Sequence, residues 1–555
     1  MKPCTDVHEC AYNRRGHGHV QYGRIPRHWF ARVLGLTSLG RICYHIRRLN
    51  STQQLTSHFH LIIRQSNTDY QDGGFISAFL TVRLTGSSIN MDETCQKIKA
   101  KASFVDGSDP HMLKVQWENG KPDEDITFEN VVAAVPLCAG EHRRTYNLLY
   151  MKRPAKDEEE KSVVYVVQVE DLPTAFIEEH PVQTRPSHLS IPKNQDGGSN
   201  IHVIVSIRSG TLEAAPYFEN AVRPVFCALS LSKKDYEVHH TASEQSVIDF
   251  ASNTLYPRAN AGTPQTVLLL SGDGGIVDIV NVLLQNTQSN HYVKPSIGLI
   301  ALGTGNALAN STGLNRDITR GLNSFIRGHP RSLPTFTARF SAGSELLTDE
   351  GKKAVPLSID TSGTGIVHGA VVCSWALHAS LVADSDTAEY RKYGAQRFQM
   401  AAQELLKPSD GSEPHHYRGR ISLTKKDANG QESTTYLDQK EHTYILATLV
   451  SKLEQSLTIS PASKPLDGQL RFLHFGALPG DEILRILGLA FAGGKHIQEE
   501  PVGYEPIEAL RIEFDEPEAR WRRVCVDGKI IRVGEGGWVE VRREGRDVLD
   551  LIVDL

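Results

Sequence analysis

Asp273 stands between glycines, shortly after an apolar run that is typical of a buried strand. Two further glycine-containing turns follow similar apolar runs. Glycine lets the backbone come close to a phosphate group, and the N–H groups at the start of the next helix can face that group. Asp273 adds a carboxylate, a group that can accept a proton, to such a turn. The three turns are Arg208-Ser209-Gly210, Ser271-Gly272-Asp273-Gly274-Gly275 and Gly303-Thr304-Gly305-Asn306.

Several common site motifs are missing from the sequence. The chain has neither GxxxxGK followed by Ser or Thr, nor the GxGxxG pattern of dinucleotide-binding proteins. Its 8 cysteines form no CxxC pair, and no Cys/His cluster has the spacing of zinc ligands. We therefore expect neither a structural metal nor a disulfide scaffold. This use of cysteine indicates a reducing, intracellular compartment.

The elements that position the three turns alternate regularly. A predicted strand, a turn and a predicted helix follow one another three times, which predicts an α/β domain around a parallel sheet at residues 199–345. The turns then lie at the carboxyl edge of the sheet, where ligands bind. From Val355 onward short alternating segments dominate, with one helix near Glu389–Leu406, so residues 346–555 are predicted to form a β-rich domain. The three predicted strands are Ile201–Ser206, Thr266–Leu270 and Ser296–Ala301.

The residues before this α/β domain differ in character. Residues 1–74 are basic and show little periodicity, which indicates a disordered leader or a basic arm that attracts anionic lipid. Residues 75–175 alternate between apolar and polar and predict a small β-rich accessory domain. Residues 176–198 are rich in Pro, Gly and polar residues and are interpreted as a linker. The strands predicted in the accessory domain include Phe75–Val82, Leu113–Trp117 and Val163–Val169.

Composition limits the possible partners. The 555 residues carry a formal net charge of only −5, which gives no reason to expect nucleic-acid binding. The apolar stretch Ile483–Gly494 is interrupted by Arg485 and is too short to span a membrane, and no signal peptide follows Met1. We expect a cytoplasmic protein. Nothing in the sequence indicates an oligomeric state.

Several motifs carry a resemblance to a known superfamily. The Ser271–Gly275 loop resembles the GGDG loop of the diacylglycerol kinase, sphingosine kinase and NAD kinase superfamily. Gly303–Ala309 resembles its second loop, with the NALA ending of sphingosine kinases, and Val205–Gly210 resembles the first loop. The resemblance covers roughly residues 199–540. Further segments similar to sphingosine kinases are Ala383–Asp386, Tyr390–Phe398, Tyr417–Arg420, Ser463–Gly468 and Cys525–Gly528.

This resemblance implies a two-lobed lipid kinase: a Rossmann-like parallel-sheet nucleotide domain and a β-rich, sandwich-type lipid domain, with the site between them. It implies ATP and Mg²⁺ as cofactors, a sphingoid long-chain base as the substrate, and transient contact with intracellular membranes. Asp273 takes the role of general base, while the protein ligands of the metal stay unassigned. The implied ATP-binding residues are Arg208, Ser209, Gly210, Ser271, Gly272, Gly274, Gly275, Gly303, Thr304, Gly305, Asn306, Arg391, Arg397, Asp527 and Gly528. The implied lipid-binding residues are Asp384, Asp386, Trp375 and His378.

Simpler interpretations stand beside these roles. Asn306 is also a residue type that caps helices, Arg391 and Arg397 suit solvent, and Trp375 and His378 suit a protein core. Asp384 and Asp386 also suit the start of a helix, and either of them fits the role of binding the lipid head group.

Three positions depart from the superfamily pattern. The first loop, at residues 206–212, lacks the expected Asn, Pro and second Gly. Ser271 replaces a glycine, and Lys529 replaces a glutamate after Asp527-Gly528. These departures leave a catalytically impaired lipid-binding pseudokinase as one alternative. The resemblance itself leaves two others, a ceramide or diacylglycerol kinase and an NAD kinase, which shares the GGDG loop.

Overall fold

The computed structural model describes residues 98–104, 111–117, 123–137, 145–152, 162–170, 172–180, 184–194, 197–207, 210, 212–360, 362–394 and 396–555. The predicted basic leader, the predicted strand at Phe75–Val82, and Arg208 and Ser209 lie outside these residues.

The first sheet has six strands and belongs to the region predicted as a β-rich accessory domain. Strand β1 pairs in parallel with β6, and every other pairing in this sheet is antiparallel. Leu113 and Val115 alternate with less buried residues along β2, which is the pattern from which the strand was predicted. In spatial order the strands are β3 (Glu124–Thr127), β2 (Met112–Trp117), β1 (Ile98–Phe104), β6 (Val164–Glu170), β5 (Thr145–Met151) and β4 (Val131–Pro136).

The segment predicted as a linker is packed against its neighbours. It contains the end of helix α3 (Thr174–Glu179) and the 3-10 turn η4 (Ser187–Leu189). Phe176 is fully buried against the first sheet, and Leu189 is fully buried in the core of the second sheet. The Pro- and Gly-rich composition therefore accompanies ordered turns here.

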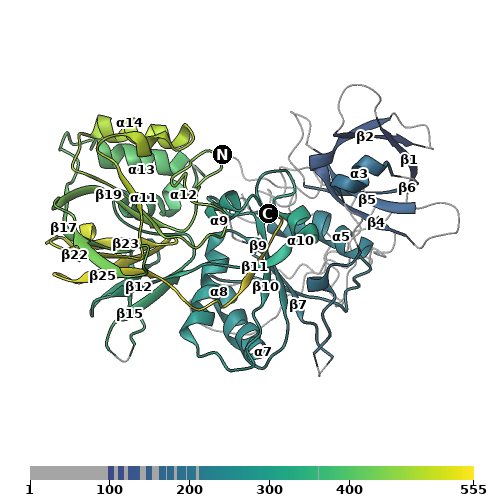
Figure 1. The fold of residues 1–555 in the computed structure, drawn as a ribbon, viewed down its shortest axis with the longest axis horizontal. Helices are drawn as coiled ribbons and strands as arrows, with labels where there is room; N and C mark the ends of the chain where they lie inside the picture. Colours follow the sequence, from purple (N-terminus) through teal and green to yellow (C-terminus); the bar gives the residue numbers. More distant parts are fainter. Residues whose placement is uncertain are drawn as a thin grey trace, which may run out of the picture. The chain divides into compact units, whose positions relative to one another are not determined.

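The second sheet is the predicted parallel sheet (Figure 1). Its four central pairings are parallel, and only β11 runs antiparallel, beside β26. The strands predicted at Ile201–Ser206, Thr266–Leu270 and Ser296–Ala301 are confirmed as β7, β9 and β10. In spatial order the strands are β11 (His329–Ser332), β26 (Asp550–Val553), β10 (Ser296–Ala301), β9 (Thr266–Ser271), β7 (Ile201–Val205) and β8 (Glu237–His240).

Helices cover both faces of this parallel sheet. Along β9, Val267 and Leu269 belong to one core with helices α6 to α9, whereas Leu268 and Leu270 belong to the opposite core with helices α4, α5 and α10. Because side chains alternate along a strand, a continuous apolar run is buried on both sides. The helices are α4 (Ala214–Tyr217), α5 (Arg223–Ala228), α6 (Ser246–Phe250), α7 (Tyr256–Asn260), α8 (Asp273–Gln285), α9 (Ala307–Ser311) and α10 (Leu322–Arg327); the turns Phe218–Val222 and Ala251–Leu255 are π-helical.

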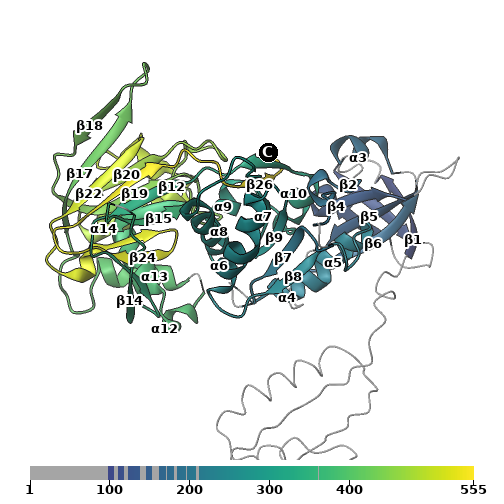
Figure 2. The ribbon, with the colours of Figure 1, turned by 90° about the horizontal axis from the view of Figure 1, so that it is seen from below.

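The third sheet is antiparallel throughout and forms the β-rich lobe, so the predicted fold class is confirmed. Figure 2 shows β17 and β18 as a hairpin that extends beyond the other strands. The strands are β12 (Phe336–Phe340), β13 (Glu345–Thr348), β14 (Lys353–Pro356), β15 (Gly365–Gly369), β16 (Val372–Ala376), β17 (Tyr417–Lys426), β18 (Glu432–Tyr436), β19 (Glu441–Thr448), β20 (Arg471–Gly476), β21 (Gly503–Pro506), β22 (Ala509–Phe514), β23 (Arg523–Val526), β24 (Lys529–Arg532) and β25 (Trp538–Arg543).

Four helices accompany this lobe. The single helix predicted near Glu389–Leu406 is divided into α12 and α13 at Gly394, whose φ of +56° does not continue a right-handed helix. The apolar stretch near Ile483 forms α14, and no helix among the described residues is long and apolar enough to cross a membrane. The helices are α11 (Leu377–Ser385), α12 (Ala388–Arg391), α13 (Gln396–Leu406) and α14 (Gly480–Phe491), with 3-10 turns at Lys495–Gln498 and Ala519–Arg522.

The end of the chain returns from the β-rich lobe to the parallel sheet. Strand β26 pairs in parallel with β10 and antiparallel with β11. Residues 346–555 were predicted as one β-rich domain, so the strand Asp550–Val553 is a difference from that prediction. Its short apolar pattern does not reveal which distant strand it joins.

Candidate active site

The glycine-containing turns pack backbone against backbone at the carboxyl edge of the parallel sheet. A Cβ atom on Gly272 would lie 2.9 Å from the Cα of Gly303, and one on Gly210 would lie 1.9 Å from the carbonyl oxygen of Leu302. Gly210 also has a φ of +52°. No larger residue fits these two positions without moving the backbone. By contrast, a Cβ on Gly274 would meet nothing within 4 Å, so this glycine faces open space.

Asp273 links two of these turns. It begins helix α8, and its carboxylate accepts hydrogen bonds from the backbone N–H groups of Ala307 (2.6 Å) and Leu308 (3.2 Å) at the start of α9. Burial raises the pKa of Asp273 to about 6, while the two N–H groups oppose that rise. Asp273 is therefore a fixed carboxylate that ionises close to neutral pH.

Asn306 stabilises its own turn. Its Oδ1 accepts a hydrogen bond from the N–H of Gly303 at 2.9 Å, and its Nδ2 donates to the carbonyl oxygen of Gly303 at 2.7 Å. Its φ is +53°, a left-handed conformation that Asn tolerates better than most residues. Thr304, in the same turn, is exposed. In this turn Asn306 sets the backbone shape, and Thr304 offers the free side chain.

A cleft of about 1200 Å³ lies between the parallel-sheet lobe and the β-rich lobe. Gly274 and Asp278 line it from helix α8, and Glu244 lines it from the segment before α6. Six of the predicted site residues from the β-rich lobe also line it: Asp384, Asp386, Arg391, Arg397, Asp527 and Gly528. Part of its wall is apolar, formed by Leu346, Leu347, Val382, Phe398, Ala401, Leu405 and Ile530.

The predicted head-group carboxylates both have arginine partners. Asp386 accepts two hydrogen bonds of 2.9 Å from Arg391 and one of 3.5 Å from Arg397. Asp384 accepts hydrogen bonds from Arg520 (3.1 Å) and Arg523 (2.8 Å). The structure thus brings together Asp386, which directly follows α11, Arg391 of α12 and Arg397 of α13.

This cluster retains unused donors. Four guanidinium groups surround the two carboxylates, and the charges of Glu244 and Glu350 also act on Arg391. Among the described residues, Arg397 Nε and Arg523 Nη2 are buried without a hydrogen-bond partner. Buried donors are normally paired, so these two groups suit an anionic ligand such as a phosphate.

Asp527 organises the opposite edge of the cleft. Its carboxylate accepts hydrogen bonds from the N–H groups of Ala370 (2.6 Å), Val371 (3.1 Å) and Val372 (2.6 Å). Burial raises the pKa of Asp527 to about 7, with a smaller upward contribution from the charge of Asp273, while the three N–H groups oppose the rise. Asp527 is therefore a fixed carboxylate on the β-rich side of the cleft.

Asp278 is a site residue that the sequence reasoning missed. Its Oδ1 lies 2.6 Å from Nζ of Lys529, the residue that departs from the superfamily pattern. Burial raises the pKa of Asp278, and Lys529 lowers it. Asp278 follows Asp273 by five positions on α8, which places it about 140° further round the helix, so this spacing gave no indication that Asp278 lines the cleft.

Trp375 and His378 lie in the interior of the β-rich lobe. Trp375 is fully buried, and its Nε1 donates to the carbonyl oxygen of Trp521 at 2.8 Å. His378 Nδ1 lies 2.7 Å from the hydroxyl of Ser374, and burial lowers its pKa to about 4. Neither residue lines the cleft. Their predicted contact with lipid stays a prediction.

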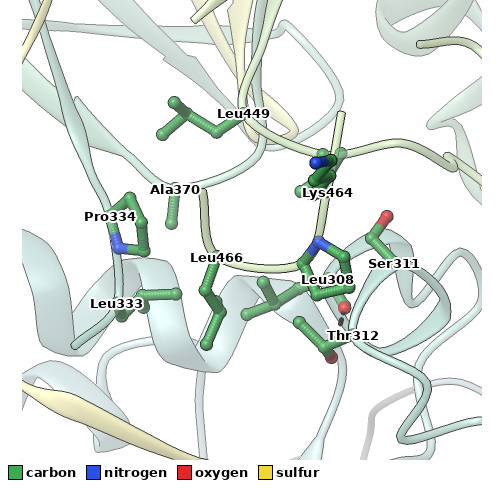
Figure 3. Close-up of a pocket in the computed structure, with 11 residues that line it drawn as sticks. Leu308, Ser311, Thr312, Leu333, Pro334, Ala370, Leu449, Lys464 and Leu466 are labelled. Atoms are coloured by element: carbon green, nitrogen blue, oxygen red, sulfur yellow. Dashed lines mark hydrogen bonds between the residues drawn. The ribbon is translucent and has the colours of Figure 1, made fainter. Parts of the chain in front are cut away.

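A second, much smaller cavity marks where the Ser463–Gly468 segment meets helix α9. It measures about 10 Å³, and Leu466 projects towards Leu308 and Leu333 there (Figure 3). A space of this size is at the lower limit for a single water molecule. The contact is therefore close packing between the lobes, next to the turn that Asp273 holds.

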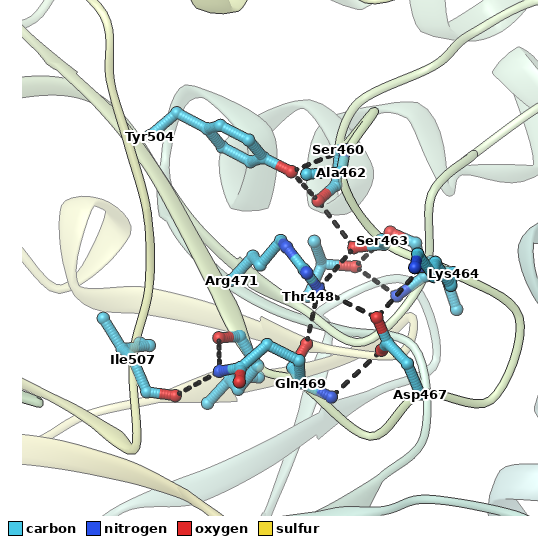
Figure 4. Close-up of polar contacts among 12 residues, drawn as sticks. Thr448, Ser460, Ala462, Ser463, Lys464, Asp467, Gln469, Arg471, Tyr504 and Ile507 are labelled. Carbon is cyan, nitrogen blue, oxygen red and sulfur yellow. Dashed lines mark hydrogen bonds and ion pairs between the residues drawn. The ribbon is translucent and has the colours of Figure 1, made fainter. Parts of the chain in front are cut away.

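Polar contacts give that segment its shape (Figure 4). Asp467 accepts hydrogen bonds from the N–H groups of Lys464 and Gln469, both at 3.0 Å, and from Arg471 at 3.2 Å. The hydroxyl of Ser460 lies 2.7 Å from both Ser463 and Tyr504. The segment that resembles sphingosine kinases thus holds Leu466 against α9.

Comparison with known proteins agrees with these motifs. Residues 200–338 match the diacylglycerol kinase catalytic domain family. The chain is 22% identical over 363 residues to Sphingosine kinase 1 of Arabidopsis thaliana, covering 60% of this chain and 68% of that protein. It is 22% identical over 371 residues to Sphingosine kinase 2 of the same plant, covering 60% and 69%.

Among solved structures, a diacylglycerol kinase from Bacillus anthracis is similar to this chain. It is 13% identical to this chain, with a TM-score of 0.39, and the match covers 64% of this chain and 96% of that chain.

The predicted resemblance to the diacylglycerol kinase and sphingosine kinase superfamily is confirmed by the sequence matches. The chain is accordingly an ATP-dependent lipid kinase by class.

Proposed function

We propose that this chain transfers the γ-phosphoryl group of ATP to a primary hydroxyl of a sphingoid long-chain base. The observation that carries the proposal is a single cleft that is lined by Gly274, the neighbour of Asp273, and that combines arginines with unused donors and an apolar wall. The similarity to two sphingosine kinases supports the sphingoid base over other lipids.

The triphosphate belongs on the glycine-rich side. Gly274 leaves open space there, and the exposed Thr304 stands on the neighbouring turn. Arg391 and Arg397 reach the cleft from the opposite lobe, where guanidinium groups suit phosphate oxygens and the negative charge that develops during transfer. Nucleotide binding between the lobes would give Arg397 Nε and Arg523 Nη2 their missing acceptors.

Asp273 is the proposed general base. As the substrate oxygen forms its bond to the γ-phosphorus, the bond from that phosphorus to the bridging oxygen of ADP breaks, and the hydroxyl proton passes to Asp273. A pKa of about 6 leaves the carboxylate mostly ionised at neutral pH and still basic enough to accept the proton. The N–H groups of Ala307 and Leu308 occupy only part of its acceptor capacity.

The lipid belongs against the apolar wall. Leu347, Val382 and Phe398 offer the surface that a long alkyl chain needs, and Asp384 and Asp386 lie beside it, each paired with two arginines. In the proposal the phosphates of ATP take over some of these arginines, and a carboxylate so released binds the ammonium group and hydroxyls of the sphingoid base; ceramide and diacylglycerol carry no cation. Because such a substrate resides in bilayers, the proposal includes transient contact of a cytoplasmic protein with intracellular membranes.

Mg²⁺ is part of the proposal. This ion keeps several waters and binds through one or two carboxylates together with substrate phosphates. Asp278 is the carboxylate on α8 that faces the cleft, and it already forms an ion pair with Lys529. The ion would supply charge neutralisation for the phosphates, while Asp278 and Lys529 position the α8 side of the cleft.

A catalytically impaired lipid-binding protein is the second candidate. The ion pair between Lys529 and Asp278 favours it, because an ammonium group occupies a place where the superfamily has a carboxylate.

The test is transfer of labelled γ-phosphate from ATP·Mg²⁺ to sphinganine, sphingosine, ceramide, diacylglycerol or NAD by the purified full chain. Label in the two sphingoid bases supports the proposal. If only ceramide, diacylglycerol or NAD is labelled, that acceptor is the substrate and the sphingoid base is not. If no acceptor is labelled although sphinganine binds in an equilibrium assay, the impaired protein is the better description.

A further inference from the structure

The parallel-sheet lobe holds a second cluster of ligating side chains, outside the cleft. His202 lies on β7, and Glu237 and His239 lie on the edge strand β8. Figure 2 shows these two strands at one end of the sheet. We propose that these three residues bind a divalent first-row transition metal ion, with zinc as the best fit, and that the ion fastens β8 to β7.

The strand register places all three side chains on one face. His202 is paired with Glu237 in the parallel ladder, and Ile204 with His239. Residues two apart on a strand share a face, so Glu237 and His239 project to the same side as His202. His240 is the next residue on β8 and projects to the opposite face. The sequence pattern gave no indication of the cluster because 34 residues separate His202 from Glu237.

The spacing of the ligand atoms matches one metal ion. His202 Nδ1 lies 3.3 Å from His239 Nε2 and 3.6 Å from Glu237 Oε2, and the latter two atoms are 3.8 Å apart. A tetrahedral zinc ion with bonds of about 2.0–2.2 Å sets its ligand atoms about 3.3–3.6 Å apart. The point about 2.1 Å from all three atoms lies in their plane, so the exposed Glu237 carboxylate has to move slightly inwards for a tetrahedral zinc ion to sit above that plane at the usual bond lengths.

Hydrogen bonding alone explains only one side of this triangle. The two imidazoles are within hydrogen-bond distance of each other, but Glu237 Oε2 is beyond that distance from both rings. The other oxygen of Glu237 accepts a hydrogen bond from the N–H of Ser199 at 3.3 Å. That bond orients the carboxylate with Oε2 towards the histidines, as outer partners do for metal ligands.

A neighbouring aromatic ring holds the two imidazoles in place. The ring of Phe250 packs against both imidazoles, with ring centroids 5.1 Å and 4.8 Å apart, and limits their rotation.

Arg258 is the cation in contact with the cluster. Its Nη1 lies 3.4 Å from His202 Nε2, so without a metal the His202 proton sits on Nδ1. When a metal takes Nδ1, the proton moves to Nε2 and that contact is lost. Arg258 keeps its hydrogen bond to the carbonyl oxygen of Ser199, at 2.9 Å. Arg258 therefore weakens the site without blocking it.

The cluster is accessible and separate from the cleft. Glu237 and His239 side chains are 40% and 35% exposed, which leaves a fourth position for water, whereas His202 is fully buried. His202 and Glu237 lie at the amino-terminal ends of their strands, and the glycine-rich turns follow the carboxyl ends. The ion would have a structural role, independent of phosphoryl transfer.

The test uses the purified full chain after removal of metal with a chelator. Zn²⁺ is titrated against a chromophoric competitor, and Co²⁺ is added separately so that its visible spectrum reports coordination. The variants are His239→Gln and Glu237→Gln, and His240→Gln on the opposite face is the matched control. His202 is left unchanged because it is fully buried.

We expect the wild type and His240→Gln to bind one tight equivalent of Zn²⁺, to give an intense tetrahedral Co²⁺ spectrum, and to melt at a higher temperature with Zn²⁺. His239→Gln and Glu237→Gln should each bind that equivalent at least about tenfold more weakly and lose the rise in melting temperature. Arg258→Gln should bind it more tightly. The proposal is overturned if the wild type has no tight equivalent, or if the two ligand variants bind Zn²⁺ as His240→Gln does.

Discussion

The Nζ atom of Lys529 lies 2.6 Å from Oδ1 of Asp278, and this ion pair joins the β-rich lobe to helix α8 of the parallel-sheet lobe. The two side chains are only 28% and 17% exposed, so water screens the pair incompletely. The positive charge that departs from the superfamily pattern thus has a matched negative partner across the cleft.

The first prediction concerns this ion pair. Lys529→Met leaves the carboxylate of Asp278 largely buried and without its cationic partner, so the free energy of unfolding should fall by about 1–3 kcal/mol. Exchanging the charges, with Lys529→Asp and Asp278→Lys together, should recover most of that loss. Urea unfolding measures both changes.

The control for the ion pair is Lys352→Met, which removes an exposed partner of Glu350 and should leave the free energy of unfolding nearly unchanged. If the exchanged double variant is as unstable as the sum of its single substitutions, the pair does not couple the lobes.

The second prediction concerns Asp273. Asp273→Asn removes the base, so kcat for the phosphorylated lipid should fall by about 10²–10⁴-fold. Asn retains an oxygen for one of the N–H groups of α9, so the free energy of unfolding should change by only about 0.5–2 kcal/mol. Asp249→Asn, on the exposed side of α6, is the matched control and should keep full activity. Normal turnover by Asp273→Asn would show that another group takes the proton.

The third prediction is a pH dependence. The base works only when it is ionised, and burial places the pKa of Asp273 at about 6. Turnover at saturating substrate should therefore be nearly constant above pH 7, reach half its maximum near pH 6, and fall about tenfold per unit below that. Initial rates between pH 5 and pH 8.5 test this. A profile that stays flat down to pH 5 would contradict the assignment of Asp273.

Local sequence patterns were sufficient for part of this fold. The apolar runs that became β7, β9 and β10 are buried on both faces, and such runs are visible without any knowledge of distant contacts. The glycines after them were recognisable because close backbone approach excludes larger residues. Strand β26 was not recognisable as part of the same sheet, because its position depends on pairing with β10 across more than two hundred residues.

The site was predictable by residue type but not by pairing. Asp386, Arg391 and Arg397 were each identified from a motif, yet their mutual ion pairs depend on how three helices meet. The contact between Asp278 and Lys529 depends on how the two lobes pack together, and no local sequence pattern predicts that packing. The cluster of His202, Glu237 and His239 likewise arises only from the register of β7 against β8.

The fourth prediction concerns Arg397, whose side chain is 15% exposed and whose Nε is buried without a partner. If a phosphate group is the missing acceptor, Arg397→Met removes charge-assisted hydrogen bonds, and kcat/KM for ATP should fall by about 10–100-fold. Arg542→Met, which removes an exposed partner of Glu432, is the control and should have little effect. Steady-state rates at varied ATP and fixed sphinganine measure both variants. A fall in kcat/KM for sphinganine with unchanged ATP parameters would instead place Arg397 at the lipid.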